Sequence, residues 1–184
     1  MVLQTTRVTV AEFEQMASLA EHAEDRLEYI GGEIVHVVSN NYCSMIAGTI
    51  LFSIRLHLRD SDLRGYVTGA DGGYVVSGER YIPDVGYISQ ANQPDPSHET
   101  WNPNPPDLAV EVMSPTDSPK HLSIKIGNYL AAGTLLWVVY PDEQEVVIHA
   151  PGKPVRVLMA ADTLDGGTVL PGFTLPVKDI FAQE

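Results

Sequence analysis

The chain has 184 residues, 44% of them hydrophobic and 8% aromatic, which is the composition of a folded globular protein and excludes a disordered one. No apolar run approaches the ~18 residues of a membrane-spanning helix, and no secretory signal is visible, so we expect one cytoplasmic domain over residues 1–184 with no membrane partner. The formal net charge is −13, from 24 acidic and 11 basic residues. Tight nonspecific binding to duplex DNA is therefore not expected, because such binding depends on lysine and arginine.

The first third of the chain predicts a helix, a hairpin and a second helix. Thr9 and Glu12 have the spacing of a capping box before apolar residues at helical intervals, so a short amphipathic helix follows Thr9. Segments 27–30 and 33–38 flank a diglycine and predict a β-hairpin. Segment 42–58 predicts a heavily buried helix, and the single cysteine, Cys43, is expected to be a small buried residue within it.

The rest of the chain predicts short strands around one further helix. Segment 90–106 is rich in Asn, Pro, Asp and Ser and predicts a long surface loop that contacts or gates a substrate. The helix begins after Ser118-Pro119 and ends at Gly133. Strands are predicted at 66–68, 74–76, 81–89, 108–113, 135–139 and 146–148.

Two of these strands each carry one acid among apolar residues, Asp84 and Glu111. Burying an ionised carboxylate costs several kcal/mol unless it is paired or bound to a metal. Two such acids on neighbouring strands suit a hard cation such as Mg²⁺, which keeps waters for substrate phosphates. Asp107 shares a strand face with Glu111 but lies where the strand begins, and so it is expected to be a cap or edge residue. None of the six histidines has a partner at ligand spacing, so zinc or iron is not expected.

Lys125 follows Glu111 on the predicted helix, at the border of an apolar stripe formed by Leu122, Ile126 and Leu130. From the border, its ammonium can reach the carboxylates, orient an attacking water and offset the charge of a phosphorane. The alternative from the residues alone is structural. Lys125 then extends to solvent, while Asp84 and Glu111 pair with backbone groups or arginine.

Four stretches, in their order and spacing, resemble the Uma-two family of the PD-(D/E)xK restriction-endonuclease-like superfamily. They are RLEYIGGE at 26–33, IPDV at 82–85, PDLAVEVMSP at 106–115, and the segment from Lys125 through Tyr129 and Gly133 to 137–139. The resemblance implies an α/β fold with a mixed β-sheet core flanked by helices, with additional β-hairpins. It also implies Mg²⁺ or Mn²⁺ held by Asp84 and Glu111, support from Glu28, and hydrolysis of DNA.

The chain departs from the superfamily pattern at three positions. Met113 stands where the pattern expects the lysine, and the family's displaced lysine corresponds to Lys125. His121 replaces an acid one turn before that lysine, and Tyr140 replaces an aspartate before Pro141. These two positions lie outside the minimal metal site.

The sequence therefore predicts a magnesium-dependent endodeoxyribonuclease with Asp84, Glu111, Lys125 and Glu28 in its site. A homodimer is expected, because cutting both strands of a duplex calls for two sites. Two other functions are compatible with the sequence. One is that of a catalytically idle relative that binds a protein or nucleic acid, which the acidic surface favours. The other is metal-dependent hydrolysis of small phosphoesters. Arginines at 55, 59, 64 and 80 are either a local basic region for nucleic acid or ordinary solvated charges.

Overall fold

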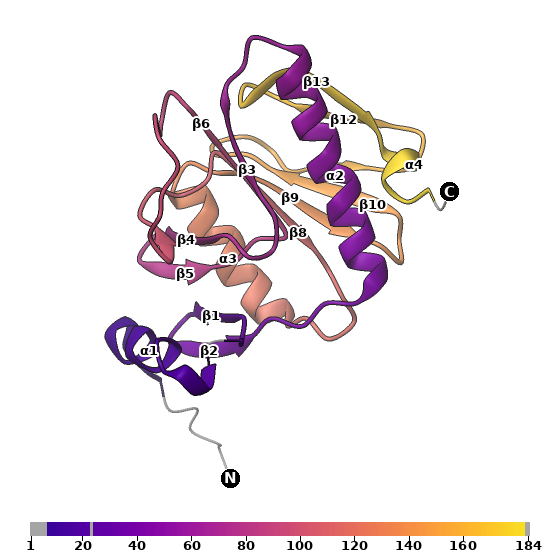
Figure 1. Cartoon of the computed structure of the whole chain (residues 1–184). Coiled ribbons are helices and arrows are strands. Elements are labelled where there is room, and N and C mark those ends of the chain that lie inside the picture. Colours follow the sequence, from indigo (N-terminus) through magenta and orange to yellow (C-terminus); the bar gives the residue numbers. More distant parts are fainter. Residues whose placement is uncertain (1–6, 23, 183–184) are drawn as a thin grey trace.

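A computed structural model describes residues 7–22 and 24–182 (Figure 1). The N-terminal part contains helix α1, a 3₁₀ turn, a β-hairpin and the long helix α2. Their bounds are α1 Val10–Ala17, the turn Ala20–His22, β1 Leu27–Ile30, β2 Glu33–His36 and α2 Asn41–Asp60. Strands and one long helix follow: β3 Gly65–Thr68, β4 Gly73–Val76, β5 Glu79–Tyr81, β6 Val85–Ser89, β7 Trp101–Asn102, β8 Leu108–Val112, α3 Pro119–Ala131, β9 Leu135–Tyr140, β10 Glu145–His149, β11 Arg156–Leu158, β12 Thr163–Gly166, β13 Leu170–Pro176 and the short α4 Val177–Ile180.

The core of the molecule is a six-stranded mixed sheet in the order β11-β10-β9-β8-β6-β3. Strands β8 and β9 run parallel, and the other neighbours are antiparallel. Helix α2 covers one face of this sheet and α3 covers the other (Figure 1). Because side chains alternate along a strand, Val110 packs beneath α2 while Ala109 packs toward α3. Glu111 therefore points to the α3 side.

A second sheet of five strands, in the order β2-β1-β5-β4-β7, lies beside the first. Helix α1 packs on it through Phe13, which contacts Tyr29 of β1 and Trp101 of β7. The fold is thus the α/β arrangement expected from the sequence, a mixed sheet flanked by helices with further β-hairpins.

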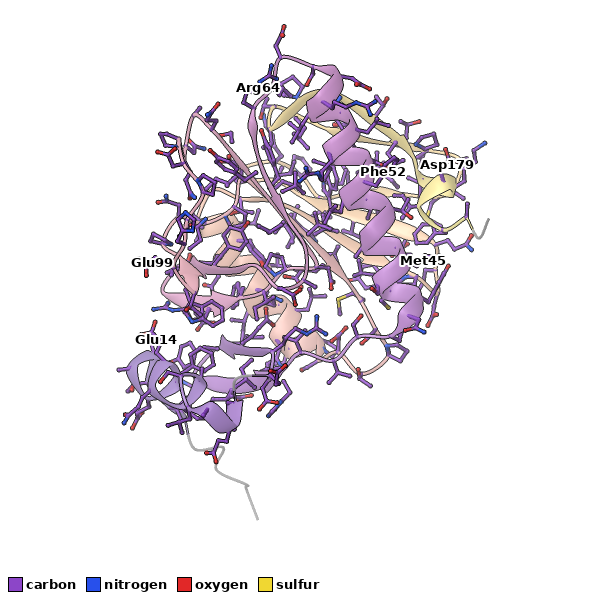
Figure 2. All side chains as sticks on the ribbon, viewed as in Figure 1. Glu14, Met45, Phe52, Arg64, Glu99 and Asp179 are labelled. Atoms are coloured by element: carbon purple, nitrogen blue, oxygen red, sulfur yellow. The ribbon has the colours of Figure 1, made fainter. Side chains whose placement is uncertain are left out.

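Most helices begin and end at the capping residues that the sequence provides. The capping box of Thr9 and Glu12 is formed, and the Asn40 side chain accepts a hydrogen bond from the Cys43 amide at the start of α2. Ser118 caps α3 with Pro119 in the first turn, and Gly133 follows its end with a φ of 86°. Cys43 is buried, as expected. Helix α2 leaves Met45 and Phe52 exposed on its outer face (Figure 2).

Two sequence expectations require correction. The predicted strand 81–89 is broken: Tyr81 ends β5 in the small sheet, and β6 begins at Val85 in the large sheet. Pro83 lies at the break, and its lack of an N–H prevents a continuous ladder through this position. Segment 90–106 is not wholly a loop, because Trp101 and Asn102 form β7 and pair with β4 in parallel.

Candidate active site

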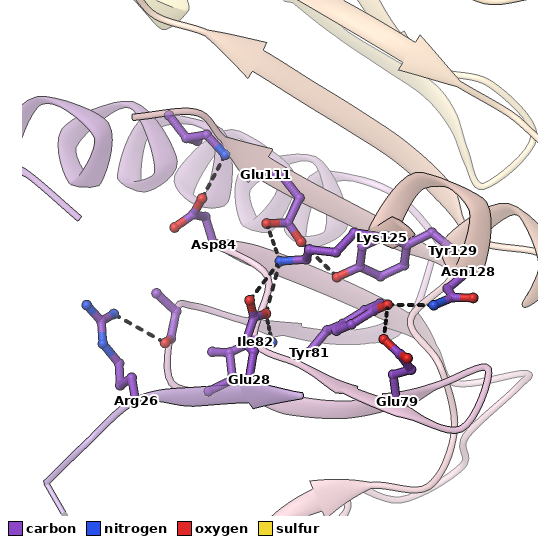
Figure 3. Close-up of polar contacts among 12 residues, drawn as sticks. Arg26, Glu28, Glu79, Tyr81, Ile82, Asp84, Glu111, Lys125, Asn128 and Tyr129 are labelled. Atoms are coloured by element: carbon purple, nitrogen blue, oxygen red, sulfur yellow. Dashed lines mark hydrogen bonds and ion pairs between the residues drawn. The ribbon is translucent and has the colours of Figure 1, made fainter. Parts of the chain in front are cut away.

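Glu111 lies on β8 at the centre of the site. Its side chain faces α3, and the residue is only 9% exposed. Both carboxylate oxygens have a donor: the Tyr129 hydroxyl donates to Oε1 at 2.9 Å, and the Lys125 ammonium donates to Oε2 at 2.7 Å. The alternation of β8 and the helical spacing of α3 thus bring these three side chains together (Figure 3).

Asp84 approaches Glu111 from the break between β5 and β6 and is not inside a strand as the sequence suggested. Its Oδ2 accepts the amide hydrogen of Val112, the residue after Glu111, at 2.7 Å. Among the residues that the structure describes, no hydrogen bond is found to its Oδ1. The Pro83 break therefore leaves Asp84 tied to β8 through one oxygen, with the other available for a ligand.

Glu28 enters the site from β1 of the smaller sheet and is 4% exposed. Its Oε1 accepts the Ile82 amide at 2.6 Å, and Lys125 lies 2.9 Å from Oε1 and 3.2 Å from Oε2. The proximity of this residue to the other three, which the sequence implied only through the family resemblance, is observed. The Lys125 ammonium on α3 therefore connects β1 of the smaller sheet with Glu111 on β8 of the larger one.

Lys125 is buried, which corrects the expectation that it lies at the border of the apolar stripe of its helix. It is 6% exposed, whereas the stripe residues Leu122, Ile126 and Leu130 are each only partly buried. Two carboxylates and the ring of Tyr81, whose centroid lies 5.3 Å from the ammonium, compensate the buried charge. The alternative in which this lysine extends to solvent is wrong.

Aromatic residues that were not assigned to the site from sequence support these charges. Tyr81 and Tyr129 pack with ring centroids 5.3 Å apart. The Tyr81 hydroxyl donates to Glu79 at 2.8 Å and accepts from Asn128 at 2.6 Å. Tyr129 follows Lys125 by four residues, and this helical spacing was the available signal; for Tyr81 the only signal was its place in the apolar run before Asp84.

Burial and mutual repulsion set the ionisation of the acids. Burial raises the pKa of Glu111 to about 8, with Glu28 and Asp84 adding to the rise and Lys125 opposing it. Burial also raises the pKa of Asp84, against the hydrogen bond from Val112. For Lys125, burial acts to lower the pKa, but Glu111 and Glu28 outweigh it and raise the pKa above its usual value. The largest cause for both acids is thus the cost of burying a charged carboxylate, and the neighbouring charges add to it or oppose it.

The four residues line one cavity of about 400 Å³. Its rim comes from the link between β2 and α2, residues 37–39, and the link between β8 and α3, residues 116–118. His121 also lines it, and its Nε2 lies 2.9 Å from Glu33, which pairs with Lys120 at 2.6 Å as well. These two hydrogen bonds lower the pKa of Glu33 to about 2.

Other candidates from the sequence lie elsewhere. Asp107 accepts hydrogen bonds from the Ser89 amide and the Asn92 side chain, which is the edge role expected of it. The residues described along this cavity include none from segment 90–106, so the expected contact of that loop with the site is not found. Arg55, Arg59 and Arg64 line a separate hollow around the C-terminal end of α2, and Arg80 instead pairs with Glu14.

The donor set suits a hard divalent cation with two protein carboxylates. Mg²⁺ is commonly held by one or two carboxylates, with waters and substrate phosphates completing its shell. Burial raises the pKa of Glu111 and Asp84, and a divalent cation would favour their ionised forms. The three ionised acids with the Lys125 ammonium would then carry two excess negative charges, the complement of one divalent ion. Within residues 7–22 and 24–182 no group of three or more His, Cys, Asp or Glu side chains is arranged to hold a metal by itself. Substrate or water oxygens would therefore complete the coordination.

The chain combines a mixed sheet with a buried cluster of carboxylates around one lysine. Comparison with known proteins identifies its family. The protein-family model described as "Uma2: Putative restriction endonuclease" matches residues 10–178, so the chain belongs to the Uma2 family. Its fold is similar to that of a protein from Anabaena variabilis, described as a putative nuclease belonging to DUF820. The TM-score is 0.81 at 20% identity, over 95% of this chain and 97% of that one. The search of curated proteins gave no match. No helix among the described residues is long and apolar enough to span a membrane.

Proposed function

We propose that this protein is a metal-dependent endonuclease that hydrolyses phosphodiester bonds of DNA. The observation that carries the proposal is the convergence of Glu28, Asp84, Glu111 and Lys125 around one cavity, although they come from four separate segments. The family description and the fold neighbour, both of which name nucleases, support hydrolysis of nucleic acid.

Asp84 and Glu111 would hold Mg²⁺ or Mn²⁺ in this proposal. When bound, such an ion would polarise the phosphate and lower the pKa of a water molecule. Lys125, already oriented by Glu28 and Glu111, positions the attacking water and offsets the negative charge that develops on the phosphoryl oxygens. Tyr129 fixes the orientation of the Glu111 carboxylate through its hydrogen bond. DNA is the proposed substrate, and a homodimer would supply one site for each strand of a duplex.

A plasmid-nicking assay with Mg²⁺ or Mn²⁺, at low and moderate salt, tests the proposal. The wild-type protein should convert supercoiled plasmid to the nicked form only when the metal is present. Asp84→Asn and Glu111→Gln should each lower the rate by at least about 100-fold. Asp142→Asn, which makes the same change at an exposed turn residue, is the matched control and should leave the rate unchanged.

The two other functions give different results in a parallel assay. Hydrolysis of bis-p-nitrophenyl phosphate without nicking of plasmid would assign the site to small phosphoesters. Absence of both activities, with metal bound, would indicate an idle nuclease fold that serves as a binding protein. Either result contradicts the endonuclease proposal.

A further inference from the structure

Nearly all oxygens of the three site carboxylates already accept a hydrogen bond. Glu28, Asp84 and Glu111 have six carboxylate oxygens, and hydrogen bonds reach five of them: from Ile82 and Lys125 to Glu28, from Val112 to Asp84, and from Tyr129 and Lys125 to Glu111. Among described residues, only Oδ1 of Asp84 has no donor. A metal that uses both Asp84 and Glu111 must therefore share or replace a donor on Glu111.

Lys125 donates a hydrogen bond to Oε2 of Glu111, the oxygen that a metal between Asp84 and Glu111 would use. In Figure 3, Oε1 of Glu111 turns toward Tyr129, whereas the oxygen bound by Lys125 lies on the side of Asp84. A cation between Asp84 and Glu111 would meet this second oxygen and the ammonium, which is 2.7 Å from it. Two cations at one carboxylate oxygen repel each other strongly in a buried site.

Glu28 is a second anionic partner for the Lys125 ammonium. Lys125 contacts both Glu28 oxygens, at 2.9 and 3.2 Å, so it can leave Glu111 without becoming unpaired. Glu28 is itself fixed by the Ile82 amide at 2.6 Å, and the Tyr81 ring lies against the ammonium. Loss of the Glu111 contact therefore leaves the lysine with an anion and an aromatic face.

We propose that Lys125 competes with the metal for Glu111, and that Glu28 is a positioning residue that retains the lysine when the metal binds. This inference rests on the proposed function, since it concerns the same metal site. Glu28 then pairs with Lys125 and is not a ligand of the metal. It also explains why a third acid, from a different sheet, is buried beside the two proposed ligands.

Titration calorimetry with Mn²⁺ on the intact protein tests the inference without an activity readout. Lys125→Met should bind Mn²⁺ at least about tenfold more tightly than wild type, because a competing charge is removed. Glu28→Gln keeps the shape of the side chain but confines the lysine to Glu111, and should weaken Mn²⁺ binding about tenfold. In the Lys125→Met background, Glu28→Gln should weaken binding less than about threefold, because the lysine it acts through is gone.

Each other result contradicts part of the assignment. If Glu28→Gln weakens Mn²⁺ binding equally with and without Lys125, Glu28 is a metal ligand and the inference is wrong. If wild type binds Mn²⁺ and nicks plasmid, but Lys125→Met binds no more tightly, competition is refuted while the proposed function stands. If no variant binds Mn²⁺, both proposals are wrong. Should Lys125→Met fail to fold, an unchanged Mn²⁺ affinity in Glu28→Gln alone would still refute the role of Glu28.

Discussion

Lys125 is a buried charged residue whose two neighbouring carboxylates offset the cost of its burial. An isolated ammonium in a protein interior is strongly unfavourable, and it is stable here because Glu28 and Glu111 lie within hydrogen-bond distance. The same contacts give it a defined orientation, which a solvent-exposed lysine lacks. A group held in this way can act on a water without first being ordered.

Replacing Lys125 by methionine should separate packing from charge. Methionine preserves much of the apolar stem, so secondary structure by circular dichroism should remain, while the rate of plasmid nicking should fall by about 100- to 10,000-fold. Lys120→Met is the matched control, because Lys120 is exposed on the same helix. Normal nicking by Lys125→Met would remove this residue from the chemistry.

Glu33 should contribute to stability in a pH-dependent manner. Hydrogen bonds from Lys120 and His121 lower its pKa to about 2 in the folded protein, below the value of about 4.3 for an unfolded chain. Because the folded-state pKa is the lower one, the stabilisation is complete above about pH 4.3 and is lost as the pH falls toward 2. Urea unfolding should show wild type more stable than Glu33→Gln at pH 7, with the difference shrinking below about pH 4.

The exposed Glu143 provides the control for this pH dependence. Glu143→Gln should change the urea midpoint little at either pH. A difference between wild type and Glu33→Gln that stays constant from pH 7 to pH 3 would show that Glu33 stabilises the fold by packing and not by charge.

At the scale of elements, the break at Pro83 is what joins the two sheets at the site. The chain leaves β5 of the small sheet, passes Pro83 and Asp84, and enters β6 of the large sheet. The amide of Ile82 holds Glu28, and the Asp84 carboxylate holds β8 through Val112. A continuous strand would place these residues within one ladder and could not bridge the sheets.

Helix α2 provides a test of which face stabilises the fold. Ile50 is fully buried against the large sheet, whereas Phe52 is 64% exposed two residues later. Ile50→Ala should therefore lower the free energy of unfolding by about 2–5 kcal/mol, measured with urea. Phe52→Ala, although it removes a larger side chain, should change it by less than about 0.5 kcal/mol. A large loss from Phe52→Ala would mean that this face is covered in solution.

For the whole molecule, the net charge bears on the proposed binding of DNA. The net charge is −13, and the residues described along the site cavity include no arginine, since Arg55, Arg59 and Arg64 gather around the C-terminal end of α2. Phosphate contacts by basic residues supply most nonspecific affinity. If the site acts on DNA as proposed, a bound metal would therefore supply much of its attraction to phosphate.

Binding of duplex DNA without divalent metal should accordingly be weak. Fluorescence anisotropy with a labelled duplex should give a dissociation constant above about 1 μM at 0.15 M salt. Its dependence on salt should be shallow, because few phosphates are neutralised. Nanomolar binding in the presence of a chelator would contradict this expectation and favour a DNA-binding role that does not need the metal.

The sequence by itself predicted most elements of the fold and the residues of the candidate site. Capping residues, glycines and apolar periodicity are local signals, so α1, α2, α3 and the strands around them were predicted closely. Isolated acids in apolar runs indicated Asp84 and Glu111, since a buried carboxylate needs a partner. Lys125 was a candidate from its place on the helix after Glu111, and the resemblance to the family to which the chain belongs supported it and added Glu28.

Only the tertiary structure decided what these residues contact. Sequence periodicity placed Lys125 at the edge of its helix, because hydropathy scores a lysine as exposed and takes no account of distant carboxylates. The burial of Lys125 depends on Glu28, which is 97 residues away, and on Tyr81 at the end of β5. Pro83 is a local signal for a break in segment 81–89, but the assignment of its two parts to different sheets depends on pairing with β1 and β8. Charge compensation and strand pairing act between distant segments, and so they appear only in the folded chain.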